Sequence, residues 1–324
     1  MFTRYSLYIS MLVNIVFYLL SPTAGFCVEL ILLDGQKWST GGAIGSTPAI
    51  DFLAVTMTRC IPTKPLSPGY YEFKISPASI VLKREVSEEG LYYRHEVKGL
   101  SGAFSLTYGL SHHFGLNFTT GYAKGYDGEA KKTISDYSAG TAFTGNRSND
   151  QGYLFAANLI YDPFSDPEGF RLPIIIGISY TQASGKYEIP FIFVKNCNSC
   201  NSPPNRIGHK GKEKEVYDIG GTPTFLSISP QFNTGPVRWV PFIFMVGGPG
   251  TSSKVEVTQS DLTTGESRVS QVDVGGGGIG GLGLEIIYRP WNLSYTYIPP
   301  SLGNLSGGFH DTIESHALTW SKNW

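Results

Sequence analysis

The feature that most constrains the fold is a regular alternation of short and long connections between segments in which apolar and small or polar residues alternate. The clearest example is residues 102–124, where two such segments are separated only by His112 and His113. A period of two is that of a β-strand with one apolar face, and two strands joined this tightly must be antiparallel neighbours. The connections "FSDPEGF", "NTGPVRW" and "RP" repeat the short turn. Between them lie long stretches at residues 125–152 and 185–221, which we expect to be loops, and at residues 251–274, which form a further long loop or an extended hairpin arm.

This asymmetry predicts an all-β fold, an antiparallel transmembrane β-barrel with short periplasmic turns and long extracellular loops. A soluble sandwich has no reason to keep such an alternation. We expect about ten strands, with eight to twelve possible. They are placed near residues 102–111, 114–124, 151–161, 171–183, 222–232, 238–247, 278–289 and 291–298, with a final downward strand ending at Trp324 and one upward strand from residues 70–85. A segment such as "DFLAVTMTR" adds wall strands if the count is twelve.

Composition agrees with a β protein rich in turns and aromatic side chains. The chain has 39 Gly, 19 Phe and 19 Tyr, and only 16% of its residues are charged, against roughly 25% in an average soluble domain. The formal net charge is -1, so no overall positive field is present to attract nucleic acid. We expect no nucleic-acid partner.

The N-terminus has the pattern of an export signal. Arg4 precedes the apolar core "ISMLVNIVFYLL", and Thr23 and Gly25 form a plausible cleavage pair. We predict a signal peptide at residues 1–25, a barrel at residues 69–324, and between them, at residues 26–68, an N-terminal extension, a plug or first strands. Four prolines interrupt that middle segment, which fits a barrel wall poorly.

The chain ends on "SHALTWSKNW", a strand pattern closed by an aromatic residue. Together with the export signal and the alternating turns, this resembles Gram-negative outer-membrane β-barrel proteins. The resemblance implies a place in the bacterial outer membrane, contact with outer-membrane lipid and lipopolysaccharide, and recognition by the barrel-insertion machinery. Leu318, Trp320 and Trp324 would carry that insertion signal.

The sequence leaves three functions open. The one that we favour is a narrow channel or porin-like transport protein. The alternatives are a surface-binding barrel, which would contact a protein partner through its long loops or its N-terminal segment, and an embedded hydrolase. The channel interpretation rests on small or polar residues at expected inward positions. They are Ser105, Thr107, Asn117, Thr119, Asn158, Ser179, Ser227, Ser229, Glu285, Asn292, Ser294 and Thr296. Interlocking Arg and Glu would instead indicate a sealed barrel, and only Glu285 and Arg289 hint at that.

We expect no enzyme activity, metal or cofactor. His209, His310 and Asp311 are candidate hydrolase residues, but no GxSxG or HExxH motif is present. Cys197 and Cys200 form a CxxC pair that is read as a disulfide, because a zinc site would need two further ligands. A second bridge could join Cys27 to Cys60. The glycines of residues 275–283 suit a crowded or curved strand.

Overall fold

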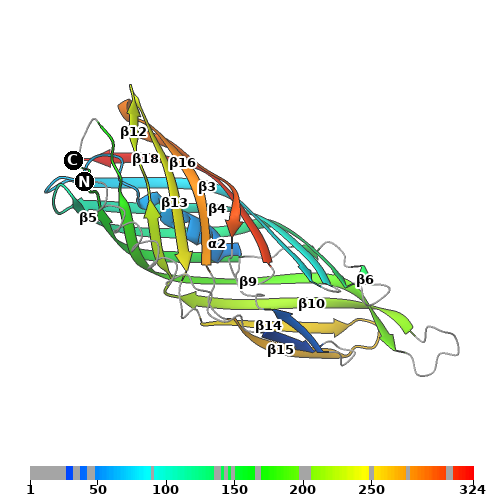
Figure 1. The fold of residues 1–324 in the computed structure, drawn as a ribbon. Coiled ribbons are helices and arrows are strands. Elements are labelled where there is room, and N and C mark those ends of the chain that lie inside the picture. Colours follow the sequence, from blue (N-terminus) through cyan, green and yellow to red (C-terminus); the bar gives the residue numbers. More distant parts are fainter. Residues whose placement is uncertain are drawn as a thin grey trace, which may run out of the picture.

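The computed structural model describes residues 27–31, 37–41, 48–88, 91–134, 140–141, 145–146, 150–164, 169–196, 206–247, 252–274, 278–303 and 309–324 (Figure 1). The helical elements are α2 (Pro48–Thr56), η1 (Met57–Cys60) and η2 (Arg289–Trp291). The strands are β1 (Cys27–Ile31), β2 (Lys37–Gly41), β3 (Tyr71–Glu88), β4 (Leu91–Gly109), β5 (Phe114–Ile134), β6 (Gly140–Thr141), β7 (Gly145–Asn146), β8 (Asp150–Tyr161), β9 (Ile174–Asn196), β10 (Arg206–Gly221), β11 (Thr224–Ile228), β12 (Phe232–Thr234), β13 (Val237–Gly247), β14 (Ser252–Asp261), β15 (Ser267–Val274), β16 (Gly278–Tyr288), β17 (Leu293–Gly303) and β18 (Phe309–Asn323).

Ten antiparallel strands close into a barrel. The order around the wall is β3, β4, β5, β8, β9, β11, β13, β16, β17 and β18, and β18 pairs with β3 to complete the ring. β11 pairs with both β9 and β13, which closes the other side. The predicted fold class and strand count are therefore confirmed. The upward strand that we expected within residues 70–85 is the long strand β3.

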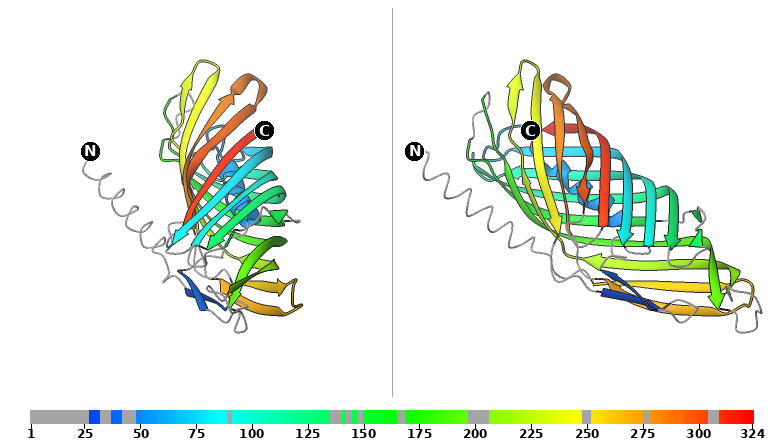
Figure 2. Two further views of the ribbon diagram at one scale, coloured as in Figure 1. Left: turned by 90° about the vertical axis from the view of Figure 1, so that its right-hand side faces the viewer. Right: turned by 45° about the vertical axis from the view of Figure 1, so that its right-hand side comes forward.

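The short connections lie at one end of the barrel, which we call the short-turn end. The turn between β4 and β5 lies there, and so do the η2 turn between β16 and β17 and the closing bonds of Trp324 with Tyr71. Figure 2 shows the strands running away from this end, where the C-terminus is marked, and some of them extending beyond the barrel on the other side, the outer end.

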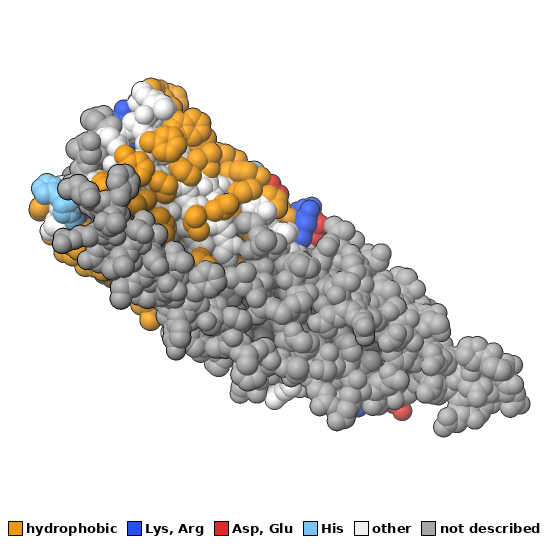
Figure 3. Space-filling view, viewed as in Figure 1, with side chains coloured by type: hydrophobic (Ala, Val, Ile, Leu, Met, Phe, Trp, Pro, Cys, Tyr) orange, Lys and Arg blue, Asp and Glu red, His pale blue; other side chains and the backbone are white. Residues whose placement is uncertain are grey.

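A belt of apolar side chains covers the outside of the barrel near the short-turn end (Figure 3). Its middle is formed by large side chains that are 42–57% exposed: Phe104, Leu106, Phe118, Phe155, Leu159, Ile176, Ile178, Ile243, Leu282 and Leu318. Aromatic residues flank it, with Tyr71, Phe114, Tyr161, Tyr288, Trp291, Trp320 and Trp324 at the short-turn end and Tyr122, Tyr153 and Tyr180 at the outer end. An apolar belt of this size would promote aggregation in water, whereas the hydrocarbon core of a membrane stabilises it.

Beyond the belt, four strands continue as an extension that we call the outer arm. It consists of the part of β9 after Thr181 together with β10, β14 and β15, paired in that order. For residues 125–152 and 185–221 the sequence led us to expect loops, and this is wrong where the structure describes them, since β5 continues to Ile134 and β9 and β10 occupy the second stretch. For residues 251–274 the alternative of an extended hairpin arm is confirmed, because β14 and β15 pair as a hairpin. On β10 the exposed positions carry charged residues such as Lys212 and Asp218, and the apolar alternation that we relied on is absent there.

The segment "DFLAVTMTR", considered as a wall strand, is helical instead. Its residues form most of α2 and all of η1 except Cys60. α2 lies inside the barrel (Figures 1 and 2). Phe52, Leu53, Val55 and Met57 are all completely buried, and a helix that is apolar all round must be surrounded by protein. None of the helices in the described ranges is long and apolar enough to cross a membrane.

Candidate functional site: the barrel lumen

The lumen is filled by residues 48–69, which we call the lumen segment. Its first half is α2 and η1, and its second half is an extended stretch that leads to β3. The packing of the first half depends on glycines in the wall. A Cβ atom added at Gly99 would lie 2.1 Å from the Phe52 ring, and one at Gly152 would lie 2.9 Å from Leu53 Cδ1. Only glycine lets the wall approach the helix so closely.

The same close fit continues toward the short-turn end. A Cβ at Gly121 would lie 2.8 Å from Thr56 Cγ2, and one at Gly109 would lie 2.2 Å from the Ser67 carbonyl oxygen. The wall and the lumen segment are thus matched in shape over most of the height of the belt.

The wall around α2 is apolar on its inner face. Buried side chains from many strands meet the helix and one another in a single core: Ile80, Leu82, Val97, Ala123, Leu154, Phe242, Phe244, Val246, Ile279, Ile298 and Ile313. Phe242 occupies space that a side chain at Gly283 would need, since a Cβ there would be 2.2 Å from its ring. This half of the lumen is a packed core and not a water-filled passage.

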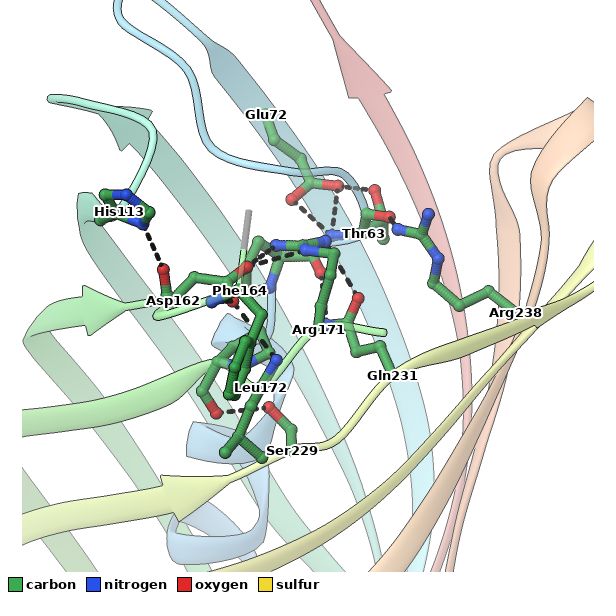
Figure 4. A network of polar contacts seen from close by, with 12 residues as sticks. Thr63, Glu72, His113, Asp162, Phe164, Arg171, Leu172, Ser229, Gln231 and Arg238 are labelled. Atoms are coloured by element: carbon green, nitrogen blue, oxygen red, sulfur yellow. Dashed lines mark hydrogen bonds and ion pairs between the residues drawn. The ribbon is translucent and has the colours of Figure 1, made fainter. Parts of the chain in front are cut away.

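The extended half is held by polar side chains of the wall (Figure 4). Glu72 accepts hydrogen bonds from the Thr63 backbone N–H, at 3.2 and 3.1 Å, and from the Thr63 hydroxyl. Lys74 donates to the Ile61 carbonyl and Arg238 to the Thr63 carbonyl. Tyr70 precedes β3 at the short-turn end, and burial and the charge of Glu72 raise the pKa of its hydroxyl, which stays neutral.

A buried ion pair anchors this network to the turn between β8 and β9. Arg171 contacts Asp162 Oδ2 through Nε at 2.8 Å and Nη2 at 2.7 Å, and both side chains are buried. Arg171 Nη1 also donates to Gln231 Oε1 at 3.0 Å, and Gln231 Nε2 donates to the Pro62 carbonyl at 3.0 Å. Gln231 therefore connects the ion pair to the lumen segment (Figure 4).

Arg59 brings a further charge into the lumen. It is 4% exposed and donates to Ser315 Oγ at 3.3 Å. Glu285 is the carboxylate that interacts electrostatically with it, and Ser294 donates to that carboxylate at 2.6 Å. Glu285 was expected to face the lumen, but its interaction with Arg59 was not foreseen.

The predicted inward residues, Asn292 excepted, are buried on the inner face. Several bond to one another: Asn117 donates to Ser105 at 2.6 Å and to Thr107 at 2.9 Å, and accepts from Thr119 at 2.8 Å and from Asn158 at 2.9 Å. Ser179 and Ser229 donate to the carbonyls of Pro223 and Pro173, while Ser227 and Thr296 are simply buried. Asn292 lies instead in the turn after η2, where its φ of 51° fits a left-handed turn residue.

The cysteine predictions have different outcomes. Cys60 is a free, buried thiol in the lumen, so the suggested bridge with Cys27 is not formed. Cys197 and Cys200 lie outside the described residues. Among the residues that the structure does describe, no group of three or more His, Cys, Asp or Glu could hold a metal ion.

The candidate hydrolase residues lie on separate strands. His209 is on β10, which pairs with β9 and β14, whereas His310 and Asp311 are on β18, which pairs with β17 and β3. At the C-terminus, Leu318, Trp320 and Trp324 are 55%, 44% and 65% exposed on the outer surface.

The side chains that hold the lumen segment in place were not predicted from the sequence: Glu72, Lys74, Arg171, Gln231 and Arg238. A signal was present, because Glu72, Lys74 and Ser76 share the inward parity of β3. Such interlocking charge is what we had expected of a sealed barrel.

No family model and no curated protein matches this chain in sequence. Among solved structures, the outer membrane protease OmpT from Escherichia coli is 10% identical, with 80% of this chain and 99% of that chain covered and a TM-score of 0.49. The translocator domain of the autotransporter NalP from Neisseria meningitidis (9% identity, 84% and 95% covered, TM-score 0.33) and the outer membrane protein OprG from Pseudomonas aeruginosa (6%, 79% and 98%, 0.32) are also similar. At these levels the similarities decide nothing about activity.

The fold itself is that of an outer-membrane β-barrel. The ten wall strands form a closed ring, so each of them has a partner on both sides, and the apolar belt requires lipid. The closed wall and its outer apolar belt are the architecture of barrels that span a lipid bilayer.

Proposed function

We propose that this protein is a sealed outer-membrane barrel that works through its outer arm, without conducting solute and without enzymatic activity. One observation carries the proposal: the lumen segment is buried inside the barrel and fits wall glycines at Gly99, Gly109, Gly121 and Gly152. A wall shaped so closely to one segment of its own chain supports a permanent filling. This favours the surface-binding alternative over the channel that the sequence favoured.

The outer arm supports a contact role. It carries exposed apolar side chains, with Leu262 63% and Val269 58% exposed, beside exposed charged residues such as Lys212 and Asp218. Protein contact surfaces combine these two kinds of side chain. The partner that fits is a macromolecule at the cell surface.

Contact with anionic lipid headgroups is a second part of the proposal. Lys83, Lys98 and Lys124 are exposed on three adjacent strands, β3, β4 and β5. They lie just beyond the outer edge of the apolar belt, and Figure 3 shows basic side chains there. Phosphorylated headgroups, including those of lipopolysaccharide, suit such a position.

The test is conductance of the purified, refolded protein in a planar bilayer. We expect the full chain to be silent. A variant in which residues 252–274 are deleted removes β14 and β15, which are not part of the closed wall, and it should be equally silent. Steady current from the full chain would contradict the proposal.

A gated channel is the second candidate, favoured by the polar half of the lumen. Glu72, Lys74, Arg238 and Glu285 would line a wet passage if the lumen segment moved. In that case voltage should produce current in the full chain. A disulfide between Thr56→Cys and Gly121→Cys, at positions that touch, should abolish the current until a reductant is added.

A further inference from the structure

The lumen segment runs from the outer end of the barrel toward the short-turn end, and its contacts with two neighbouring strands show this independently. On β4, Phe52 packs at Gly99 and Ser67 at Gly109. On β5, Thr56 packs at Gly121 and Leu66 at Gly115. Both strands place the earlier residue nearer the outer end and the later residue nearer the short-turn end.

The segment passes through the whole thickness of the membrane. Gly99 and Gly109 are ten residues apart on β4, which is roughly 33 Å of strand at about 3.3 Å per residue. With a strand tilt of about 40°, this corresponds to a height of roughly 25 Å, the usual height of the apolar band. Beside Gly99, Leu100 is exposed in the belt, and Lys98 lies beyond its edge.

The chain makes this passage only once within the described residues. Phe52, Leu53, Val55 and Met57 are completely buried against the wall, so no room is left beside them for a second strand of chain. The start of α2 therefore lies toward the outer end of the barrel.

The β1–β2 hairpin lies where this route leads. β1 lies beside β15 of the outer arm, and both views show the hairpin next to β14 and β15 at a distance from the short-turn end (Figures 1 and 2). β1 and β2 pair with each other and form a sheet separate from the barrel.

We infer that the β1–β2 hairpin is displayed on the cell surface and docked on the β15 side of the outer arm, with the chain entering the lumen at α2 from the outer end. The lumen segment then connects the two sides of the membrane, since β3 begins at the periplasmic end and β1 and β2 lie outside the cell. This inference does not depend on whether the barrel conducts.

The experiment is protease accessibility on intact cells. A flexible insert with a specific protease site is placed directly after Gly41, at the end of β2. The same insert after Thr263, in the turn between β14 and β15, marks the outside, and after His112, in the turn between β4 and β5, it marks the periplasm. Heat-dependent mobility on a gel confirms that each variant is a folded barrel.

We expect the insert after Gly41 to be cut in intact cells to the same extent as the insert after Thr263, and the insert after His112 to be cut only once the outer membrane is permeabilised. If the Gly41 insert stays uncut in intact cells while the Thr263 insert is cut, the inference is overturned. The inference would also be overturned if a membrane-impermeant label reached the insert after Thr263 on intact cells but did not reach the insert after Gly41.

Discussion

The α2 helix of the lumen segment is held by its shape, whereas the extended half is held by individual polar contacts. A helix satisfies its own backbone hydrogen bonds, so α2 can lie against an apolar, glycine-rich wall. The extended half has backbone groups with no partner of their own, so the wall must supply them, as Glu72, Lys74, Gln231 and Arg238 do. The local structure of the filling thus determines the chemistry of the wall at each level.

The largest expected effect comes from the helical half. Phe52→Ala removes a completely buried ring and should lower the free energy of unfolding by about 3–5 kcal/mol. Unfolding in urea, followed by tryptophan fluorescence in lipid vesicles, measures it. The loss should be insensitive to salt, because no charge is involved. A change below 1 kcal/mol would show that α2 is not packed as described.

The next effect tests the fit of the wall to the helix. Gly99→Ala places a methyl group 2.1 Å from the Phe52 ring and should cost about 1–3 kcal/mol through overpacking. Gly102→Ala is the matched control on the same strand, since nothing lies within 4 Å of its added Cβ. It should change stability by less than about 0.5 kcal/mol.

Phe52→Ala combined with Gly99→Ala makes the second test sharper. If the two residues meet as described, the double variant should lose less than the sum of the single losses, because the smaller residue makes room for the added methyl group. Strict additivity in urea unfolding would argue that Gly99 serves some purpose other than the approach of α2.

The extended half should respond to a change of charge without a change of size. Glu72→Gln keeps the volume but weakens the hydrogen bonds from Thr63, and we expect a loss of about 1.5 kcal/mol, typical of a bond to a charged group. Glu314→Gln is the control, since that side chain is 37% exposed. Equal effects of the two variants on urea unfolding would remove the distinction between the halves.

The barrel wall could be predicted from the sequence because its signal is local. Phe104, Leu106 and Tyr108 alternate with Ser105 and Thr107, and lipid on one side and polar neighbours on the other impose that period. The inward burial of most predicted lumen residues follows from the same parity.

The filling could not be predicted, for two physical reasons. α2 has no polar face, because protein surrounds it, so Phe52, Leu53 and Val55 show no helical period. The polar contacts join distant parts of the chain: Arg238 and Thr63 are 175 residues apart, and only the closed barrel brings them together. Of the outer arm, β10 was missed because charged residues such as Lys212 and Asp218 leave it without an apolar alternation.

The smallest effect is expected where the lumen segment reaches solvent. Lys64 Nζ donates to Asn323 Oδ1 at 2.5 Å, and this contact is exposed at the short-turn end. Because water can replace this contact, Lys64→Ala should lower the free energy of unfolding in urea by at most about 0.5 kcal/mol. This is well below the loss expected for Glu72→Gln, although Glu72 binds Thr63, the residue next to Lys64. A loss as large as that of Glu72→Gln would mean that the extended half is held along its whole length, including its wet end, and that burial is not what separates strong from weak contacts in this lumen.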